Sequence, residues 1–326
     1  MAFVTASLSN PGGRSVNEDA CGFAEFGGAG CWVVCDGLGG HGGGSTASRL
    51  AVDAVLNAFR ANPMVNAEAL RSQLAAANGA IRNRQTEPSL AHMRSTIIVL
   101  LANDMTAVCG HLGDSRLYQF HEAAVRFQTV DHSVPGALAA GGSIEYNAIR
   151  FHEDRNRVLR SLGNEGEINP VIVERALCQG DAFLLCTDGF WEYVTELEME
   201  ADSVKTSTPE EWLRFMASRL LSRAKPDNDN WTAMAVFFRS VAAPVTETRK
   251  PGSALTLTEK LSWAAIASLT ATLVLFLGVA RYPQRVAEAL KLPPRIPLPH
   301  MNAPNRGQPP AQPNPAADRD RQPGRK

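Results

Sequence analysis

Hydrophobic residues in the first 240 positions fall into short blocks, and their spacing separates two kinds of secondary structure. Apolar runs rich in β-branched residues and bounded by turn residues predict strands, several of them joined as hairpins. Seven runs fit this description: Trp32–Cys35, Thr96–Leu101, Ala107–His111, Arg116–Phe120, Val171–Val173, Phe183–Cys186 and Thr232–Phe238.

Helical spacing appears between these runs, in three blocks. After a cap signal at Ser45–Thr46, one face carries Val52, Val55, Leu56 and Phe59, and the next block places Leu70, Leu74, Ala77 and Ile81 on one face. The third block, Pro209–Arg223, begins with proline and acidic residues and is expected to turn Trp212, Phe215, Met216 and Leu220 inward.

The order of these elements predicts the fold class. Strand, two helices, many strands, helix and strand is not the order of a doubly wound sheet. It favours an α+β fold, a four-layer α-β-β-α sandwich in which two antiparallel sheets pack face to face with helices outside.

Composition changes sharply near residue 240, where a polar stretch rich in linker residues begins. We therefore expect a catalytic domain at 1–240, a linker at 241–260, a helix at 261–280 and a Pro-rich, disordered tail at 281–326. The twenty residues 261–280 carry no charge between Lys260 and Arg281, which is about the length that crosses a bilayer. A buried core helix is the alternative, but such a helix would usually keep a more polar face.

Charge and cysteine content exclude several classes of protein. The 32 basic and 33 acidic residues give a net charge of −1, so binding to nucleic acid through bulk charge is not expected. The six cysteines form no CxxC pair, which argues against a zinc site or a secreted disulfide framework. The N-terminus has no signal-like segment, so the first domain is expected to fold in the cytoplasm.

Acidic residues recur where predicted strands end. The motifs RSVNEDA, CDGLGGHGGG, GDSR, CTDG and DNWT each place carboxylates there, and each alone is consistent with an ordinary turn. Together they predict a cation site, because carboxylates gathered at the mouth of a sheet repel one another unless hard cations neutralise them. Oxygen ligands favour Mg²⁺ or Mn²⁺, and two such ions could acidify a bridging water for phosphoryl displacement.

These motifs, with the STII strand, DHS, NRVLRSLG and LLCTDGFWEYVT, occur in the order found in the PPM family, the metal-dependent protein phosphatases of the 2C type. The resemblance covers roughly residues 5–240. It implies that Asp36 bridges two metals, that Gly37 lends its backbone carbonyl, that Glu18 binds the second metal, and that Asp188 and Asp229 bind the first.

The resemblance also implies that Asp114 helps to hold a third, weaker ion and that Arg14 grips the substrate phosphate. Many members have a histidine two residues after the bridging aspartate, where this chain has Leu38, so the general acid stays unassigned; His41 is one option and a metal-bound water another. The segment 135–151 fits the flap beside the family's active site. Three residues are expected beside the metals without binding them: Asp19, His41 and Asn230.

The expected function is hydrolysis of phosphoserine and phosphothreonine in proteins, opposing a membrane-associated Ser/Thr kinase. A pseudophosphatase that serves as a membrane-tethered binding module is the alternative, and a small regulatory or anti-sigma-like protein is a further possible target. We expect a bacterial inner-membrane protein with one span and a cytoplasmic catalytic domain. The number of Lys and Arg residues on each side of the span slightly favours a cytoplasmic tail by the positive-inside rule. We nevertheless expect the tail outside, because exporting a short tail is a smaller task than exporting a folded enzyme.

Overall fold

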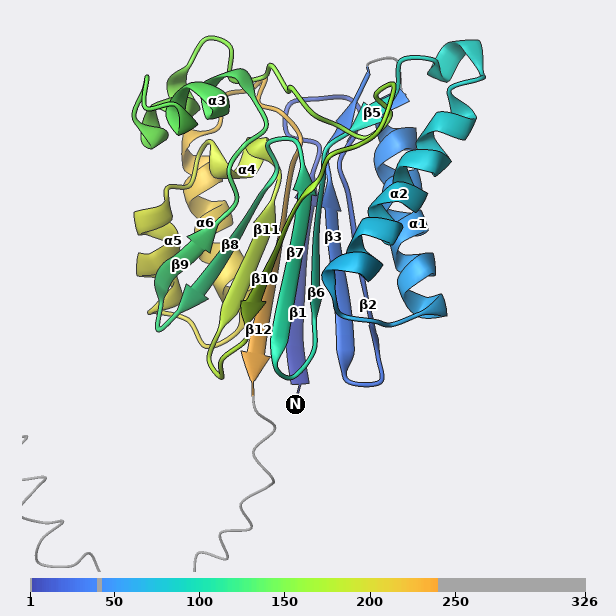
Figure 1. The fold of residues 1–326 in the computed structure, drawn as a ribbon. Helices are drawn as coiled ribbons and strands as arrows, with labels where there is room; N and C mark the ends of the chain where they lie inside the picture. Colours follow the sequence, from blue (N-terminus) through green and yellow to red (C-terminus); the bar gives the residue numbers. More distant parts are fainter. Residues whose placement is uncertain (1, 40–42, 240–326) are drawn as a thin grey trace, which may run out of the picture. The chain divides into compact units, whose positions relative to one another are not determined.

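Two five-stranded antiparallel sheets form the centre of the computed structural model, which describes residues 2–39 and 43–239 (Figure 1). The first sheet contains, in spatial order, β1 (Ala2–Asn10), β12 (Trp231–Arg239), β11 (Ala182–Cys186), β8 (Arg116–His121) and β9 (Ala124–Gln128). The second contains β10 (Val171–Ala176), β7 (Thr106–Leu112), β6 (Ile97–Ala102), β3 (Ala29–Cys35) and β2 (Ala20–Phe26). A short ribbon pairs β4 (Gly37–Leu38) with β5 (Arg94–Ser95).

Helices cover the outer face of each sheet, as Figure 1 shows. The second sheet is covered by α1 (Gly43–Ala61) and α2 (Ala67–Arg84), and the first by α5 (Glu196–Ser203) and α6 (Pro209–Arg223). Shorter elements are α3 (Val134–Ala140), α4 (Asp188–Trp191) and the 3₁₀ turns η1 (Pro88–Leu90) and η2 (Tyr146–Phe151). The predicted four-layer α-β-β-α sandwich is confirmed.

Three separate hydrophobic cores hold the layers together, because alternate residues of a strand face opposite sides of its sheet. In β3, Trp32 and Val34 point into the core between the two sheets, where they meet residues of the first sheet such as Met234. Cys31 and Val33 point the other way, into the core beneath α1 and α2. Both faces of β3 are thus buried, which explains why its sequence is a continuous apolar run.

The seven predicted strands and three predicted helices are all present, but several details differ. The first helix begins at Gly43, so Ser45 and Thr46 lie inside it and not before it. Phe215 is 47% exposed, since the inward arc of α6 passes through Leu213 instead. Five strands were missed: β4 and β5 have only two residues each, and β1, β2 and β9 are only partly buried and carry many small or polar residues.

No helix within the described ranges is long and apolar enough to span a membrane. The span predicted at 261–280, with the linker 241–260 and the tail 281–326, lies outside the described residues. Those three assignments therefore remain predictions.

Candidate active site

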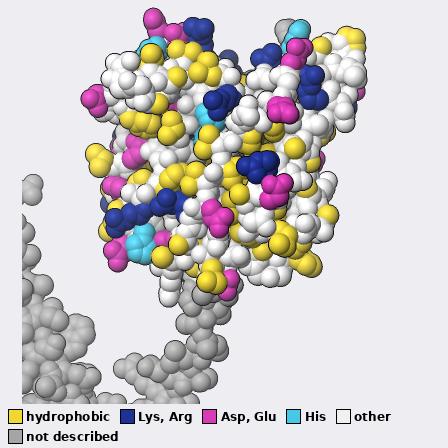
Figure 2. Space-filling model, viewed as in Figure 1, with side chains coloured by type: hydrophobic (Ala, Val, Ile, Leu, Met, Phe, Trp, Pro, Cys, Tyr) yellow, Lys and Arg dark blue, Asp and Glu magenta, His cyan; other side chains and the backbone are white. Residues whose placement is uncertain are grey.

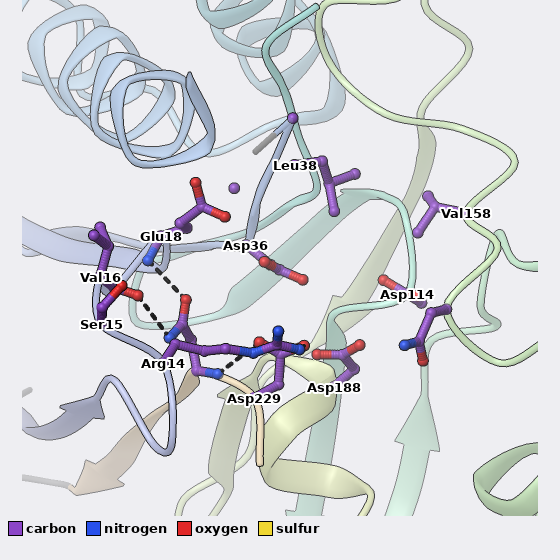
Figure 3. A pocket seen from close by; sticks show the side chains of 14 residues that line it. Arg14, Ser15, Val16, Glu18, Asp36, Leu38, Asp114, Val158, Asp188 and Asp229 are labelled. Carbon is purple, nitrogen blue, oxygen red and sulfur yellow. Dashed lines mark hydrogen bonds and ion pairs between the residues drawn. The ribbon is translucent and has the colours of Figure 1, made fainter. Parts of the chain in front are cut away.

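A cavity of about 630 Å³ opens at the ends of the central strands, and carboxylates from distant parts of the chain face it (Figure 3). The acidic side chains come from the segment before β2, the end of β3, the β7–β8 turn, the start of α4 and the segment before β12. The lining residues are Arg14, Ser15, Val16, Glu18, Asp36, Gly37, Leu38, Gly39, Asp114, Asn156, Val158, Asp188, Asp229 and Asn230.

Asp36 follows the last residue of β3, and its backbone is held by β5 and β6. Its N–H donates to Thr96 Oγ1 (3.0 Å), while its carbonyl accepts from the Thr96 N–H (2.9 Å) and from Ser95 Oγ (2.9 Å). The backbone N–H and carbonyl of Asp36 are thus both hydrogen-bonded. The end of β3 and the start of β6 together therefore fix the position of the Asp36 side chain.

Gly37 explains part of the glycine-rich stretch that follows Asp36. A Cβ atom at this position would lie 2.2 Å from the Gly44 carbonyl oxygen and 2.5 Å from that of Glu18. Only glycine allows these three segments to approach so closely. The start of α1 and the segment of Glu18 are thereby brought against the end of β3.

Asp188 and Asp114 lie on the other side of the cavity. Asp188 is the first residue of α4, where its Oδ1 accepts from the Gly189 N–H (2.6 Å). The Asp114 turn is held by Trp191, whose indole Nε1–H donates to the Asp114 carbonyl (3.0 Å). The side chain of Asp114 is only 2% exposed, and its Oδ1 has no hydrogen-bond partner among the described residues.

Asn230 ties the N-terminal segment to the strand that carries Asp229. Its Oδ1 accepts from the Glu18 N–H (2.8 Å), and its Nδ2 donates to the carbonyls of Pro11 (2.8 Å) and Val16 (3.0 Å). Asn230 also lines the cavity, and its hydrogen bond from the Glu18 N–H helps to position Glu18.

Arg14 lies beside a carboxylate in this structure. Its Nη2 donates to Asp229 Oδ2 (3.1 Å), and both side chains are about half exposed (Figure 3). The Asp229 Oδ1 atom accepts from the Asn230 N–H (2.8 Å). Asp229 therefore engages one of the five N–H groups of the Arg14 guanidinium.

Asp19 lies behind the cavity, outside its lining. Its Oδ2 accepts from Thr187 Oγ1 (2.9 Å), whereas its Oδ1 has no partner within the described chain. Burial raises the pKa of Asp19 to about 7. Asp19 is therefore close to predicted metal ligands but is not part of the cavity lining.

Burial and mutual repulsion of the carboxylates together shape the electrostatics of the site. The pKa of Asp36 lies well above its ordinary value, first because the carboxyl is removed from water and then because Asp188, Asp19, Asp114 and Asp229 surround it. The pKa of Asp188 is raised for the same reasons, and burial beside Asp131 raises that of Asp114 to about 7. The cluster is costly to ionise without positive charge, which is the expected property of a cation site.

The described residues contain no group of three or more His, Cys, Asp or Glu side chains that could hold an ion by itself. Backbone carbonyls and water would therefore have to complete each coordination shell, as is common for Mg²⁺. The unpartnered Asp114 Oδ1 and a backbone carbonyl from Gly37, which lines the cavity, fit such a mixed ligand set.

Ten site residues were predicted, and the structure brings eight of them to the cavity: Arg14, Glu18, Asp36, Gly37, Asp114, Asp188, Asp229 and Asn230. His41 lies outside the described residues, and Leu38, which has no proton to donate, lines the cavity. No residue of the expected flap at 135–151 is part of the described lining of the cavity. Asn156 and Val158, which follow the flap in the chain, line the cavity instead. The motif NRVLRSLG contains both and was the signal that could have identified them.

Comparison with known proteins agrees with this arrangement. Residues 11–234 match the family model described as protein phosphatase 2C. Serine/threonine phosphatase stp of Listeria monocytogenes is 30% identical over 174 residues, which cover 52% of this chain and 69% of the relative.

Solved structures extend the similarity to the whole described domain. PppA, a key regulatory component of T6SS in Pseudomonas aeruginosa, is 31% identical with a TM-score of 0.61, covering 73% of this chain and 98% of PppA. The catalytic domain of serine threonine protein phosphatase PstP, solved with two manganese ions, is 26% identical with a TM-score of 0.63, covering 73% and 99%.

Proposed function

Because the chain belongs to the protein phosphatase 2C family, we propose that it hydrolyses phosphoserine and phosphothreonine in proteins with the help of Mn²⁺ or Mg²⁺. The observation that carries the proposal is the cavity itself, where five carboxylates from five segments and one arginine converge. A cluster of acids would repel a phosphate unless cations lay between them, and the relative PstP binds two manganese ions.

The donor set on this chain suits two ions. Glu18, Asp36, the Gly37 carbonyl, Asp188 and Asp229 would hold them, and the unpartnered oxygen of Asp114 would serve a third, weaker ion. Bound cations would offset the carboxylate charge and would acidify the water that attacks phosphorus.

The protein's own groups bind and orient the substrate. Arg14 is the cationic side chain of the described lining, and its guanidinium can hold two phosphate oxygens. Leu38 and Val158 place apolar surface on the other side of the cavity (Figure 3). A phosphorylated side chain can therefore enter with its phosphate toward Arg14 and its carbon chain against these residues.

Phosphopeptide hydrolysis tests the proposal. The chain should release phosphate from phosphothreonine and phosphoserine peptides with Mn²⁺, and both EDTA and Asp36→Asn should abolish the release. The same exchange at the exposed Asp104, Asp104→Asn, is the matched control and should leave the rate unchanged. Undiminished hydrolysis by the Asp36→Asn variant would contradict the proposed role of the carboxylates.

We also propose, from the sequence alone, that residues 261–280 anchor the chain in a bacterial inner membrane with the catalytic domain in the cytoplasm, where it would oppose a Ser/Thr kinase. The uncharged stretch of twenty residues supports this proposal. An alkaline phosphatase fused after Lys326 should be active in a bacterial host. A silent fusion, with an active cytoplasmic reporter at the same position, would show that the span or its orientation is wrong.

A further inference from the structure

A second hollow, of about 480 Å³, lies on the far side of one wall of the catalytic cavity. Residues of β9, β10 and α3 contribute to its lining, and β9 and β10 are each at one edge of their sheet. Its lining is rich in apolar residues, and three of them are well exposed: Val130 (52%), Leu159 (53%) and Val171 (39%). We call this hollow the edge groove.

The segment 156–160 separates the edge groove from the catalytic cavity, and within it Val158 forms an isolated antiparallel bridge with Ser133. Val158 lines the cavity, whereas the next residue, Leu159, lines the groove. Hydrogen bonds from the Leu159 N–H to the His132 carbonyl (2.7 Å) and from the Val134 N–H to the Arg157 carbonyl (2.9 Å) hold the segment in place. The two hollows therefore meet at consecutive residues of one short stretch of backbone.

The floor of the groove also contacts the turn that carries Asp114. The imidazole rings of His111 and His132 stack there, with centroids 4.5 Å apart. The Gly113 N–H donates to His132 Nδ1 (3.3 Å), and the His132 N–H donates to the Gly113 carbonyl (2.9 Å). Gly113 directly precedes Asp114, so a molecule bound in the groove would contact the residue that holds the Asp114 turn.

The charge of the groove restricts what can bind there. Its lining includes two charged side chains, Asp131 and Arg160. Asp131 is neutralised by a buried bidentate pair with Arg116 (2.7 and 2.8 Å). Arg160 makes no ion pair within the described chain and is exposed. On the face drawn in Figure 2, apolar, basic and acidic side chains are interspersed. No large patch of one charge on that face would therefore outweigh the charge of Arg160.

We propose that the edge groove binds an apolar side chain of the phosphorylated protein substrate, with Arg160 attracting a neighbouring carboxylate of that substrate. The proposal rests on the proposed phosphatase function. Proximity to the catalytic cavity supports it, because Val158 and Leu159 are consecutive residues. A substrate chain that crosses one stretch of backbone, about 10 Å from side to side, needs about three residues at ~3.3 Å each. The preferred substrate would carry a large apolar residue about three positions from the phosphorylated one.

Steady-state kinetics on two classes of substrate test this inference. Leu159→Asp and Val171→Asp replace exposed apolar side chains, so the fold should tolerate both. With Mn²⁺, each should lower kcat/KM about tenfold for a phosphothreonine peptide carrying leucine three residues to either side. Hydrolysis of para-nitrophenyl phosphate, which cannot reach the groove, should be unchanged. Leu197→Asp, at a 77% exposed position on α5, is the matched control and should affect neither substrate.

The outcomes separate the groove from the phosphatase function. One outcome is that the wild-type chain hydrolyses a peptide with alanine three residues from the phosphothreonine as well as the peptide with leucine there. That result would leave the phosphatase function standing and overturn the groove proposal. An equal loss on both substrates in the groove variants would likewise overturn it. A dimer in light scattering that Leu159→Asp converts to monomer would instead assign the groove to a second copy of this chain. If no phosphopeptide is hydrolysed, both proposals fail.

Discussion

Thr96 is predicted to couple the two halves of the active site, because its hydroxyl lies between them. Thr96 Oγ1 accepts from the Asp36 N–H (3.0 Å) and lies 2.8 Å from Ser115 Oγ, next to Asp114. Thr96 is fully buried and Ser115 is 2% exposed, so water cannot replace either contact. We expect Thr96→Val to disturb Asp36 and the Asp114 turn at once.

The magnitude follows from the groups left without partners. Valine keeps the shape of threonine but leaves the Asp36 N–H and the Ser115 hydroxyl unpaired, and each unpaired buried group costs about 1–3 kcal/mol. We expect Thr96→Val to lower the free energy of unfolding by about 2–6 kcal/mol. Thr96→Ser keeps the hydroxyl and loses one methyl group beside Gly113, at a cost of about 1 kcal/mol.

Urea unfolding of the EDTA-treated protein measures the first effect, and calorimetric titration with Mn²⁺ measures a second. Residues that orient metal ligands typically change metal affinity by about tenfold or more, so Thr96→Val should weaken Mn²⁺ binding by about that factor. If Thr96→Ser loses as much stability and affinity as Thr96→Val, the methyl group rather than the hydroxyl is responsible. The reasoning would then be wrong.

Three further predictions concern the charges of the site. Burial raises the pKa of Asp19 and Asp114 from 3.8 to about 7, so the unfolded chain loses these protons first, and the metal-free protein should become less stable as pH rises from about 4 to 7. Its melting temperature in EDTA should therefore fall between about pH 5 and 7 and saturating Mn²⁺ should reduce that fall, whereas a rise of the melting temperature in EDTA would contradict the prediction. Asp36→Asn removes a carboxyl whose pKa is raised by burial and by its acidic neighbours, so in EDTA at pH 8 the variant should melt higher than the wild type. An unchanged or lower melting temperature would show that this buried carboxylate does not destabilise the metal-free fold. Arg14→Ala breaks a half-exposed ion pair worth at most about 1 kcal/mol, so the melting temperature should hardly change. The kcat/KM for a phosphopeptide should fall about a hundredfold, and Arg14→Lys should give an intermediate value. If the melting temperature and kcat/KM fall together, Arg14 has a structural role instead.

Much of the fold could be read from periodicity because its central strands are buried on both faces. Continuous apolar runs such as those of β3 and β6 arise only where both sides are covered, and they were predicted correctly. The edge strands β2 and β9 gave a weaker signal, because partly exposed strands tolerate small and polar residues. Phe215 was placed inward for a similar reason, since hydrophobicity alone does not define the buried arc of a helix.

The chemistry of the site was also encoded locally, in acidic motifs at strand ends and in the order of those motifs along the chain. That information was sufficient to predict which carboxylates converge, because strand ends on one edge of a sandwich meet whatever the details of packing. Eight of the ten predicted site residues line the described cavity for this reason.

Only the tertiary structure decided how those residues are held and what surrounds them. The Arg14–Asp229 pair joins positions 215 residues apart, and the hydroxyl of Thr96 connects two sheets, so neither contact has a local signature. Val158 and Leu159 are neighbours of similar character, yet one faces the catalytic cavity and the other the edge groove. Residue type and spacing determined the strands and the acids, whereas the sides to which side chains point depend on register and packing across the whole sandwich.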